Sequence, residues 1–293
     1  MLLAIVALAL MGSSPVDSLR SAIESRIAQS PGVEVGVAYV DLETGDTLYI
    51  HADTVFHAAS TMKVPVMLEL YRRASAGGIR MDQALLVVNQ FASIVDGSPY
   101  AQDPKEDSDS VMYQLVGTRV RIDSLIRHMI TRSSNLATNT LIALAGPDQV
   151  NGTLRSLGIK RMTVLRGVED LKAYDKGLNN TTTARDLATL MEAIETGRAA
   201  DAAATSAMKE VLLGQEFNTA IPAGLPNGTR VAHKTGSLTS HAHDAAIVYP
   251  AGRKPYVLVV LTRGDKKVSE LNEIIADISR LVYAKATASS AHQ

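Results

Sequence analysis

Hydrophobic residues follow a strand-like pattern near both ends of this chain. Residues 33–40 and 47–50 flank the turn Thr44-Gly45-Asp46, which predicts a hairpin. Residues 245–249 and 256–261 predict two further strands close to the C-terminus. We therefore expect one sheet that draws on both ends of the chain.

Apolar residues recur at helical spacing in the middle of the chain and again after the last strand. A further helix is expected over residues 16–28. The helix near residue 190 is expected to begin after Thr182 or Thr183 as N-cap and to end at Gly197. The three repeats are Ile122, Leu125, Ile126, Met129 and Ile130; Leu187, Leu190, Met191 and Ile194; and Leu271, Ile274, Ile275, Ile278 and Leu281.

These patterns predict two units. An α/β domain is expected from residues 15–58 and 214–293, and an all-helical domain is expected to be inserted at residues 59–213. Residues 96–110 are polar, rich in Asp and Ser, and expected to form a loop. The segments that carry chemistry would then lie where the two units meet.

Composition narrows the classes of function. The chain has 293 residues, of which 46% are hydrophobic, enough for a substantial core. Its net charge of −1 gives no electrostatic basis for binding nucleic acid or anionic lipid. It contains no cysteine, which excludes thiol nucleophiles, zinc–thiolate sites and disulfides.

The N-terminus predicts export. Residues 2–11 are all apolar and are followed by Gly12-Ser13-Ser14-Pro15, a pattern typical of a secretory signal peptide over residues 1–14. Ten residues are too few to span a bilayer. We expect a mature monomer in the periplasm or outside the cell, without a membrane span.

Candidate chemistry starts at Ser60-Thr61-Met62-Lys63. A serine hydroxyl needs a neighbour that takes its proton, and Lys63 would lie one helical turn after Ser60 on the same face. The apolar residues that follow predict a helix that begins at Ser60, whose N-terminal N–H groups favour negative charge. Such pairs also occur by chance on solvated helix faces.

Two more motifs follow in the sequence. Ser133-Ser134-Asn135 comes directly after a predicted helix, so it is either a capping turn or a hydroxyl and carboxamide that face Ser60. Lys234-Thr235-Gly236 ends a strand-like segment. It is either an edge strand whose lysine prevents pairing with another chain, or part of a functional site. Their joint order favours one site.

In these motifs the chain resembles the serine β-lactamase and penicillin-binding protein superfamily, and specifically the class A β-lactamases. The resemblance covers residues 17–285, and 233–237 (His-Lys-Thr-Gly-Ser) is its most specific stretch. It implies a three-layer α/β/α domain with an antiparallel sheet, joined to a helical domain. It also implies hydrolysis of the β-lactam amide without a cofactor.

The resemblance implies a role for each matching residue. Ser60 is the acylated nucleophile, Lys63 a base, and Ser133 a proton donor to the departing nitrogen. Asn135 holds the side-chain amide of the substrate. The substrate carboxylate is bound at Lys234, Thr235, Gly236 and Ser237, and the backbone N–H groups of Ser60 and Ser237 form the oxyanion hole.

Two departures from the family pattern stand out. Ser134 replaces the aspartate that is usual in the second motif, and the Glu-x-x-Leu-Asn segment of the omega loop is absent. Glu169 is the expected base for deacylation, with Asp170 as its rival. If neither acts, the alternatives are a D-alanyl-D-alanine peptidase or a penicillin-binding sensor that stays acylated.

Three other side chains invite a different interpretation. His241, His243 and Asp244 resemble a metal-ligand cluster, but without further spaced ligands we expect no metal there and interpret the histidines as surface or substrate-contact residues. Tyr100 and residues 241–243 are expected to shape the pocket.

Overall fold

The computed structural model describes residues 15–288, and the expected signal peptide at 1–14 lies outside them. Their main sheet has five antiparallel strands in the order β2-β1-β11-β10-β9. The strands are β1 (Glu34–Asp41), β2 (Thr47–Ile50), β9 (Arg230–Leu238), β10 (His241–Tyr249) and β11 (Tyr256–Arg263). The predicted use of both chain ends is confirmed, because β1 pairs with β11.

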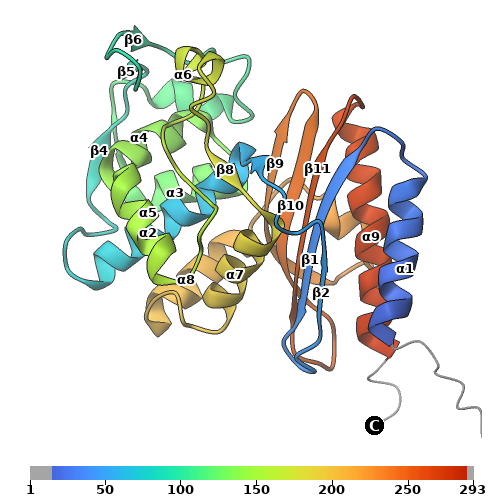
Figure 1. The fold of residues 1–293 in the computed structure, drawn as a ribbon. Coiled ribbons are helices and arrows are strands. Elements are labelled where there is room, and N and C mark those ends of the chain that lie inside the picture. The colour runs from blue at the N-terminus through green and yellow to red at the C-terminus, as the bar shows by residue number, and fades with distance from the viewer. Residues whose placement is uncertain (1–14, 289–293) are drawn as a thin grey trace, which may run out of the picture.

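Both faces of this sheet are covered. The helices α1 (Pro15–Ala28) and α9 (Val268–Ala288) lie side by side on one face, and the helical part of the chain packs on the other (Figure 1). Val37 belongs to the core under α1 and α9, whereas the next residue, Ala38, belongs to the core on the opposite face. Burial on both faces explains why the strands are almost continuously apolar.

The helical part surrounds α2, whose residues from Lys63 to Tyr71 are all buried. Short 3-10 helices precede or connect several of the α-helices. The helices are η1 (Ala59–Met62), α2 (Lys63–Ser75), η2 (Ser110–Leu115), α3 (Ile122–Thr131), α4 (Asn135–Ala145), α5 (Pro147–Ser156), α6 (Leu171–Asp175), α7 (Ala184–Glu195), α8 (Ala202–Leu213) and η3 (Ile221–Gly224). The N-cap of α7 is Thr183, whose side chain accepts a hydrogen bond from the N–H of Asp186.

The expectation of an all-helical segment at 59–213 is wrong in detail. Short strands pair within it, and one of them pairs with a strand just before it. The pairs are β3 (Phe56–His57) with β8 (Thr181–Thr182), β4 (Ala84–Leu86) with β7 (Arg119–Arg121), and β5 (Phe91–Ala92) with β6 (Pro99–Tyr100). Strands of two or three residues are too short for a period-two pattern to show in the sequence.

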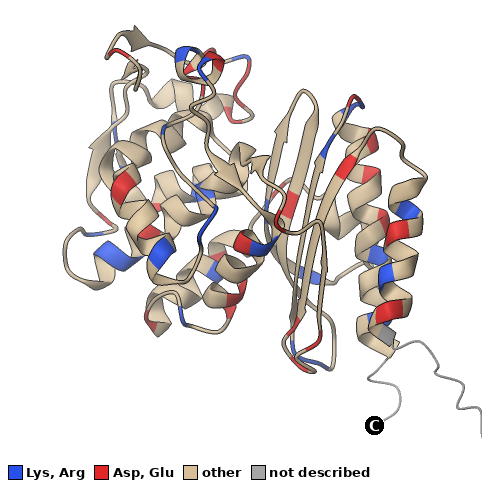
Figure 2. Ribbon diagram, in the orientation of Figure 1, with Lys and Arg blue, Asp and Glu red and all other residues tan. Residues whose placement is uncertain are grey.

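Positions of Lys and Arg and of Asp and Glu are interspersed along the helices and loops (Figure 2). One pair is buried beneath the surface: Arg253, between β10 and β11, contacts Asp41 at the end of β1, which also accepts a hydrogen bond of 2.7 Å from Tyr39. No helix within residues 15–288 is long and apolar enough to cross a membrane.

Candidate active site

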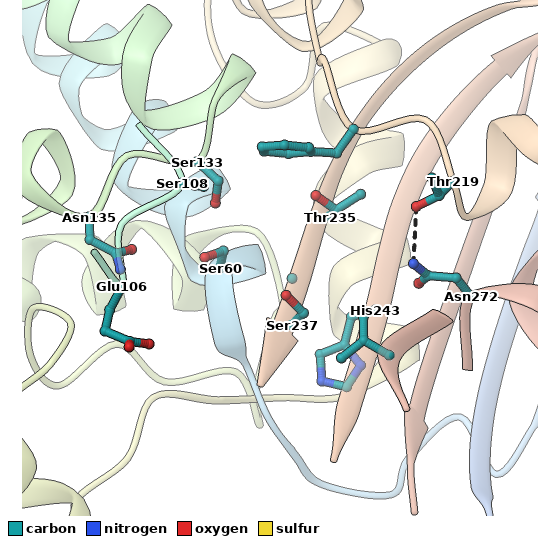
Figure 3. Close-up of a pocket in the computed structure, with 13 residues that line it drawn as sticks. Ser60, Glu106, Ser108, Ser133, Asn135, Thr219, Thr235, Ser237, His243 and Asn272 are labelled. Atoms are coloured by element: carbon teal, nitrogen blue, oxygen red, sulfur yellow. Dashed lines mark hydrogen bonds between the residues drawn. The ribbon is translucent and has the colours of Figure 1, made fainter. Parts of the chain in front are cut away.

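A cavity of about 330 Å³ lies where β9 meets the helical part of the chain. Ser60, Ser133 and Asn135 line one side, and Thr235 and Ser237 line the other (Figure 3). The full lining is Ser60, Glu106, Ser108, Ser133, Asn135, Phe217, Thr219, Thr235, Gly236, Ser237, His243, Val268 and Asn272. The three motifs of the sequence therefore contribute to one cavity of the size that holds a small ligand.

Ser60 lies in the 3-10 helix η1 and not, as expected, at the start of the α-helix, which begins at Lys63. Pro65 accounts for the difference, because it has no N–H to donate to Thr61 four residues earlier. Ala59, just before the serine, has φ of 45°, and its N–H donates to Nδ1 of His57 at 2.9 Å. The nucleophile candidate thus sits on a backbone turn that a neighbouring side chain stabilises.

Lys63 is completely buried, and its ammonium connects the first motif to the second. Its Nζ donates to the carbonyl oxygen of Ser133 at 2.6 Å, to Ser133 Oγ at 3.2 Å and to Asn135 Oδ1 at 2.9 Å. Burial lowers the pKa of Lys63 to about 7. A lysine with this pKa is partly neutral at physiological pH and is then able to accept a proton.

A second buried ammonium approaches the same hydroxyl. Lys234 Nζ donates to Ser133 Oγ at 3.0 Å and to the carbonyl oxygen of Thr235 at 2.8 Å. Burial, followed by the charge of Lys63, lowers the pKa of Lys234 well below its usual value. Ser133 Oγ thus lies between two amines, where it is placed to pass protons.

Gly236 allows β9 to pass close to Ser60, the candidate nucleophile. A Cβ added to it would lie 2.9 Å from the amide nitrogen of Ser60 and 3.1 Å from that of Thr61. Real Cβ atoms do not approach backbone nitrogen this closely, so glycine is required here. The close approach brings the Thr235 and Ser237 side of the cavity next to Ser60.

The two rival acids of the omega loop have different surroundings. Glu169 accepts a hydrogen bond of 2.8 Å from Asn135 Nδ2, and burial raises its pKa. Asp170 instead accepts from Ser93 Oγ, from the N–H of Ile94 and, as N-cap of α6, from the N–H of Ala173. Only Glu169 of these two shares a hydrogen bond with a residue that lines the cavity.

Backbone strain is concentrated at this cavity. Of the four non-glycine residues between 15 and 288 with positive φ, three belong to the site: Ala59, Ser133 with φ of 57° and Glu169 with φ of 64°. Such conformations persist where surrounding contacts hold them, and they cluster at functional sites.

Comparison with known proteins agrees with this geometry. The sequence profile of the β-lactamase enzyme family matches residues 18–286. This chain belongs to that family. Its resemblance to the class A β-lactamases is confirmed, and with it the assignment as a serine hydrolase of the class A type.

Individual relatives cover most of the chain. β-Lactamase AST-1 of Nocardia asteroides is 30% identical over 88% of this chain and 81% of its own length. A point mutant of PBP-A, solved as an acyl-enzyme complex with penicillin G, is 26% identical with a TM-score of 0.79 over 94% and 98% of the two chains. An ancestral class A β-lactamase is 26% identical with a TM-score of 0.77 over 92% and 99%.

Several cavity residues of this family member were not found from the sequence. Thr219 Oγ1 accepts a hydrogen bond of 3.0 Å from Asn272 Nδ2, beside the Thr235 side of the cavity (Figure 3). Glu106 is the one formally charged side chain among the described residues of the lining. Asn272 could have been noticed as a polar residue between Leu271 and Ile274, whereas Thr219 carries no comparable signal.

The side chains expected to shape the pocket occupy different places. His243 lines the cavity, and its Nε2 donates to the carbonyl oxygen of His57 at 2.9 Å. Tyr100 instead lines a second cavity behind the omega loop, where its hydroxyl donates to the carbonyl oxygen of Val168 at 3.3 Å. Within residues 15–288 no three His, Asp or Glu side chains are grouped to hold a metal ion.

Proposed function

We propose that the protein hydrolyses β-lactams through an acyl-enzyme on Ser60. The observation that carries this proposal is the buried ammonium of Lys63, whose pKa is about 7 and whose hydrogen bonds reach Ser133 and Asn135 in the cavity that holds Ser60. The PBP-A mutant solved as an acyl-enzyme with penicillin G supports the same chemistry on this fold.

In the proposed acylation, neutral Lys63 takes the proton of Ser60 Oγ. The oxygen attacks the lactam carbonyl carbon, and the N–H groups of Ser60 and Ser237 stabilise the resulting oxyanion. The carbon–nitrogen bond then breaks, and the nitrogen receives a proton from Ser133 Oγ. Ser133 regains its proton from Lys63, to which it is hydrogen-bonded at 3.2 Å.

Substrate binding is assigned to the two walls of the cavity. Asn135 would hold the side-chain amide of the substrate. Thr235 and Ser237 would bind its carboxylate with their hydroxyl groups. Lys234 does not line the cavity, and its ammonium would attract the carboxylate from behind Ser133, to which it donates a hydrogen bond. Because the described lining contains no lysine or arginine, the substrate carboxylate would depend on hydroxyl groups and on this buried ammonium.

In the proposed deacylation, Glu169 takes a proton from a water molecule that attacks the ester carbonyl. The ester bond to Ser60 Oγ breaks, Oγ takes up the proton that Glu169 removed from the water, and the ring-opened acid leaves. The support for Glu169 is its hydrogen bond with Asn135 and a pKa raised by burial, which suits a base that works near neutral pH.

We further propose that the chain is exported, as the apolar run at residues 2–11 indicates, and that it acts as a monomer. The division into residues 15–58 with 214–293, and 59–213, likewise remains a proposal. N-terminal sequencing of protein from the producing cell tests export: a mature N-terminus between residues 12 and 18 supports it, and an intact Met1 contradicts it.

The nucleophile is tested with the variant Ser60→Ala. We expect intact-protein mass spectrometry to show a penicillin adduct on the wild type and none on the variant, with unchanged circular dichroism because a hydrogen atom replaces a hydroxyl group at a cavity wall. Turnover of a chromogenic cephalosporin is lost in parallel. An adduct on the variant would contradict the assignment, and a wild type that stays acylated would contradict hydrolysis.

A further inference from the structure

The second motif lacks its usual aspartate, yet helix α4 begins directly inside it. The first N–H groups of a helix have no acceptor within the helix, so the turn must supply them. Ser134 is the N-cap, and its Oγ accepts from the N–H of Ala137 at 3.2 Å. The N–H groups of Asn135 and Leu136 therefore need an acceptor from elsewhere in the chain.

Asp107 supplies that acceptor from a loop distant in sequence. Its Oδ2 accepts from the N–H of Asn135 at 2.9 Å and from the N–H of Leu136 at 3.0 Å, and it lies 3.5 Å from Ser134 Oγ. Asp107 is only 7% exposed. A buried carboxylate thus lies at the N-terminus of α4, where negative charge is stabilised by the helix dipole.

The two residues that follow Asp107 also connect its loop to the segment just before the Ser133–Asn135 turn. Ser108 Oγ donates to the carbonyl oxygen of Arg132 at 2.6 Å, and Asp109 contacts His128 Nδ1 at 2.6 Å. Arg132 precedes Ser133, whose φ of 57° requires support from its surroundings. The contacts of this loop therefore lie on both sides of the strained residue.

We propose that Asp107 is a positioning residue that takes the place of the missing motif aspartate and holds the Ser133–Asn135 turn against Lys63. This inference rests on the proposed function, because it concerns the residues assigned there to proton transfer and substrate binding. Asp107 acts through the backbone of Asn135 and does not line the cavity.

The charge of Asp107 also acts on the base. Burial lowers the pKa of Lys63, whereas the nearby carboxylates of Asp107 and Glu169 oppose that shift. Lys234 is the other ionisable group that faces Lys63 here, and the two ammonium groups repel each other. Removal of the Asp107 charge should therefore lower the pKa of Lys63 further, an effect that a purely structural role would not produce.

The test compares four variants in the full-length protein. Asp107→Asn keeps the shape and removes the charge, and Asp107→Ala removes both. Asp107→Ala combined with Ser134→Asp returns a carboxylate to the motif position, where Asp is a good N-cap. Asp148→Asn is the matched control, since it removes an exposed carboxylate from the first turn of another helix, α5.

Acylation rates are measured by stopped flow between about pH 5 and 9, with thermal unfolding followed by circular dichroism. We expect Asp107→Ala to slow acylation about 10²-fold, the cost of misplacing reacting groups by about 1 Å. The double variant should recover about tenfold or more of that loss, because its carboxylate again caps the helix. In Asp107→Asn, the fall of the acylation rate at low pH should move to lower pH.

Other outcomes overturn the proposal. Unchanged acylation in a folded Asp107→Ala protein would contradict it, and so would a double variant that is folded but no faster than Asp107→Ala. A pH profile of Asp107→Asn that coincides with that of the wild type would contradict the electrostatic part. A wild type that forms no adduct would overturn the proposed function itself, and so is distinguishable from failure of this inference alone.

Discussion

The carboxylate of Glu169 accepts a hydrogen bond of 2.8 Å from the side-chain amide of Asn135. The oxygen of the same amide accepts one of 2.9 Å from Lys63. A single carboxamide therefore lies between the base proposed for deacylation and the base proposed for acylation. The two steps should respond separately to substitution of the two bases.

Glu169→Gln should leave acylation fast and make the acyl-enzyme accumulate, because glutamine keeps the hydrogen-bonding shape but cannot take a proton from water. Mass spectrometry should show stoichiometric adduct, and turnover should show a burst equal to the enzyme concentration. Since burial raises the pKa of Glu169, wild-type deacylation should slow as pH falls through that raised value. Normal turnover by the variant, judged against Glu24→Gln on α1, would reassign the base.

Lys63 should give acylation a pH dependence of its own. Only the neutral amine accepts a proton, so the acylation rate should rise with pH and level off above the pKa of about 7. Lys63→Ala should slow acylation about 10²–10⁴-fold and abolish this dependence. Single-turnover mixing at several pH values measures both. A variant that retains the wild-type profile would show that another group accepts the proton.

Gly236→Ala should impair acylation by crowding the backbone of Ser60, since the new methyl group would lie 2.9 Å from its nitrogen. We expect the acylation rate to fall on the order of 10²-fold, because a displacement of a reacting group by about 1 Å has an effect of that size. Gly152→Ala, in α5, is the matched control, because a Cβ there meets nothing within 4 Å. Equal activity of the two variants would show that the backbone of β9 shifts to accommodate the methyl group without moving Ser60.

Asp41→Asn should reduce stability but not the activity of folded molecules. The buried Arg253 guanidinium would lose the carboxylate of Asp41 and keep only that of the partly exposed Glu43, 3.2 Å from its Nε. Breaking a buried ion pair typically costs about 3–5 kcal/mol, and the remaining contact with Glu43 should keep the loss toward the low end of that range. Burial raises the pKa of Asp41, but hydrogen bonds from Tyr39 and Arg253 outweigh it and lower the pKa overall.

The stability that Asp41 contributes is therefore present above its unfolded pKa and lost as pH falls through the lower folded value. Urea unfolding at several acidic pH values should show a weaker pH dependence in Asp41→Asn than in the wild type. Asp41→Asn combined with Arg253→Met should recover part of the loss. An unchanged free energy of unfolding in the single variant would contradict the role of the pair.

Much of the fold could be predicted because its strands and helices have regular apolar patterns. The hairpin of β1 and β2 and the apolar repeat of α9 are visible in the sequence, and both the hairpin and the helix are confirmed. The predicted start of α2 was wrong by three residues, because Pro65 has its effect through a missing backbone donor that an apolar pattern does not report.

The site residues likewise differ in how far the sequence reveals them. Ser60 and Lys63 share one short motif and Ser133 belongs to another, so each can be recognised from its neighbours in sequence. The carboxylate of Asp107 accepts a hydrogen bond from the backbone of Asn135, which is distant in sequence, and no local sequence pattern predicts such a contact. The choice between Glu169 and Asp170 depends on a φ of 64° that turns two adjacent carboxylates toward different partners, and their sequence positions alone left both open.

The pairing of β1 with β11 delays completion of the candidate site until late in synthesis of the chain. Val37 lies opposite Val260, so the centre of the sheet cannot close until nearly all of the chain has been synthesised. Closing so long a loop lowers the conformational entropy of the chain, and this loss is offset only when the last strand pairs in the sheet. A growing chain therefore carries Ser60 from early in synthesis, but β9, which supplies the Thr235 and Ser237 side of the cavity, is synthesised late, and the cavity around Ser60 is complete only then.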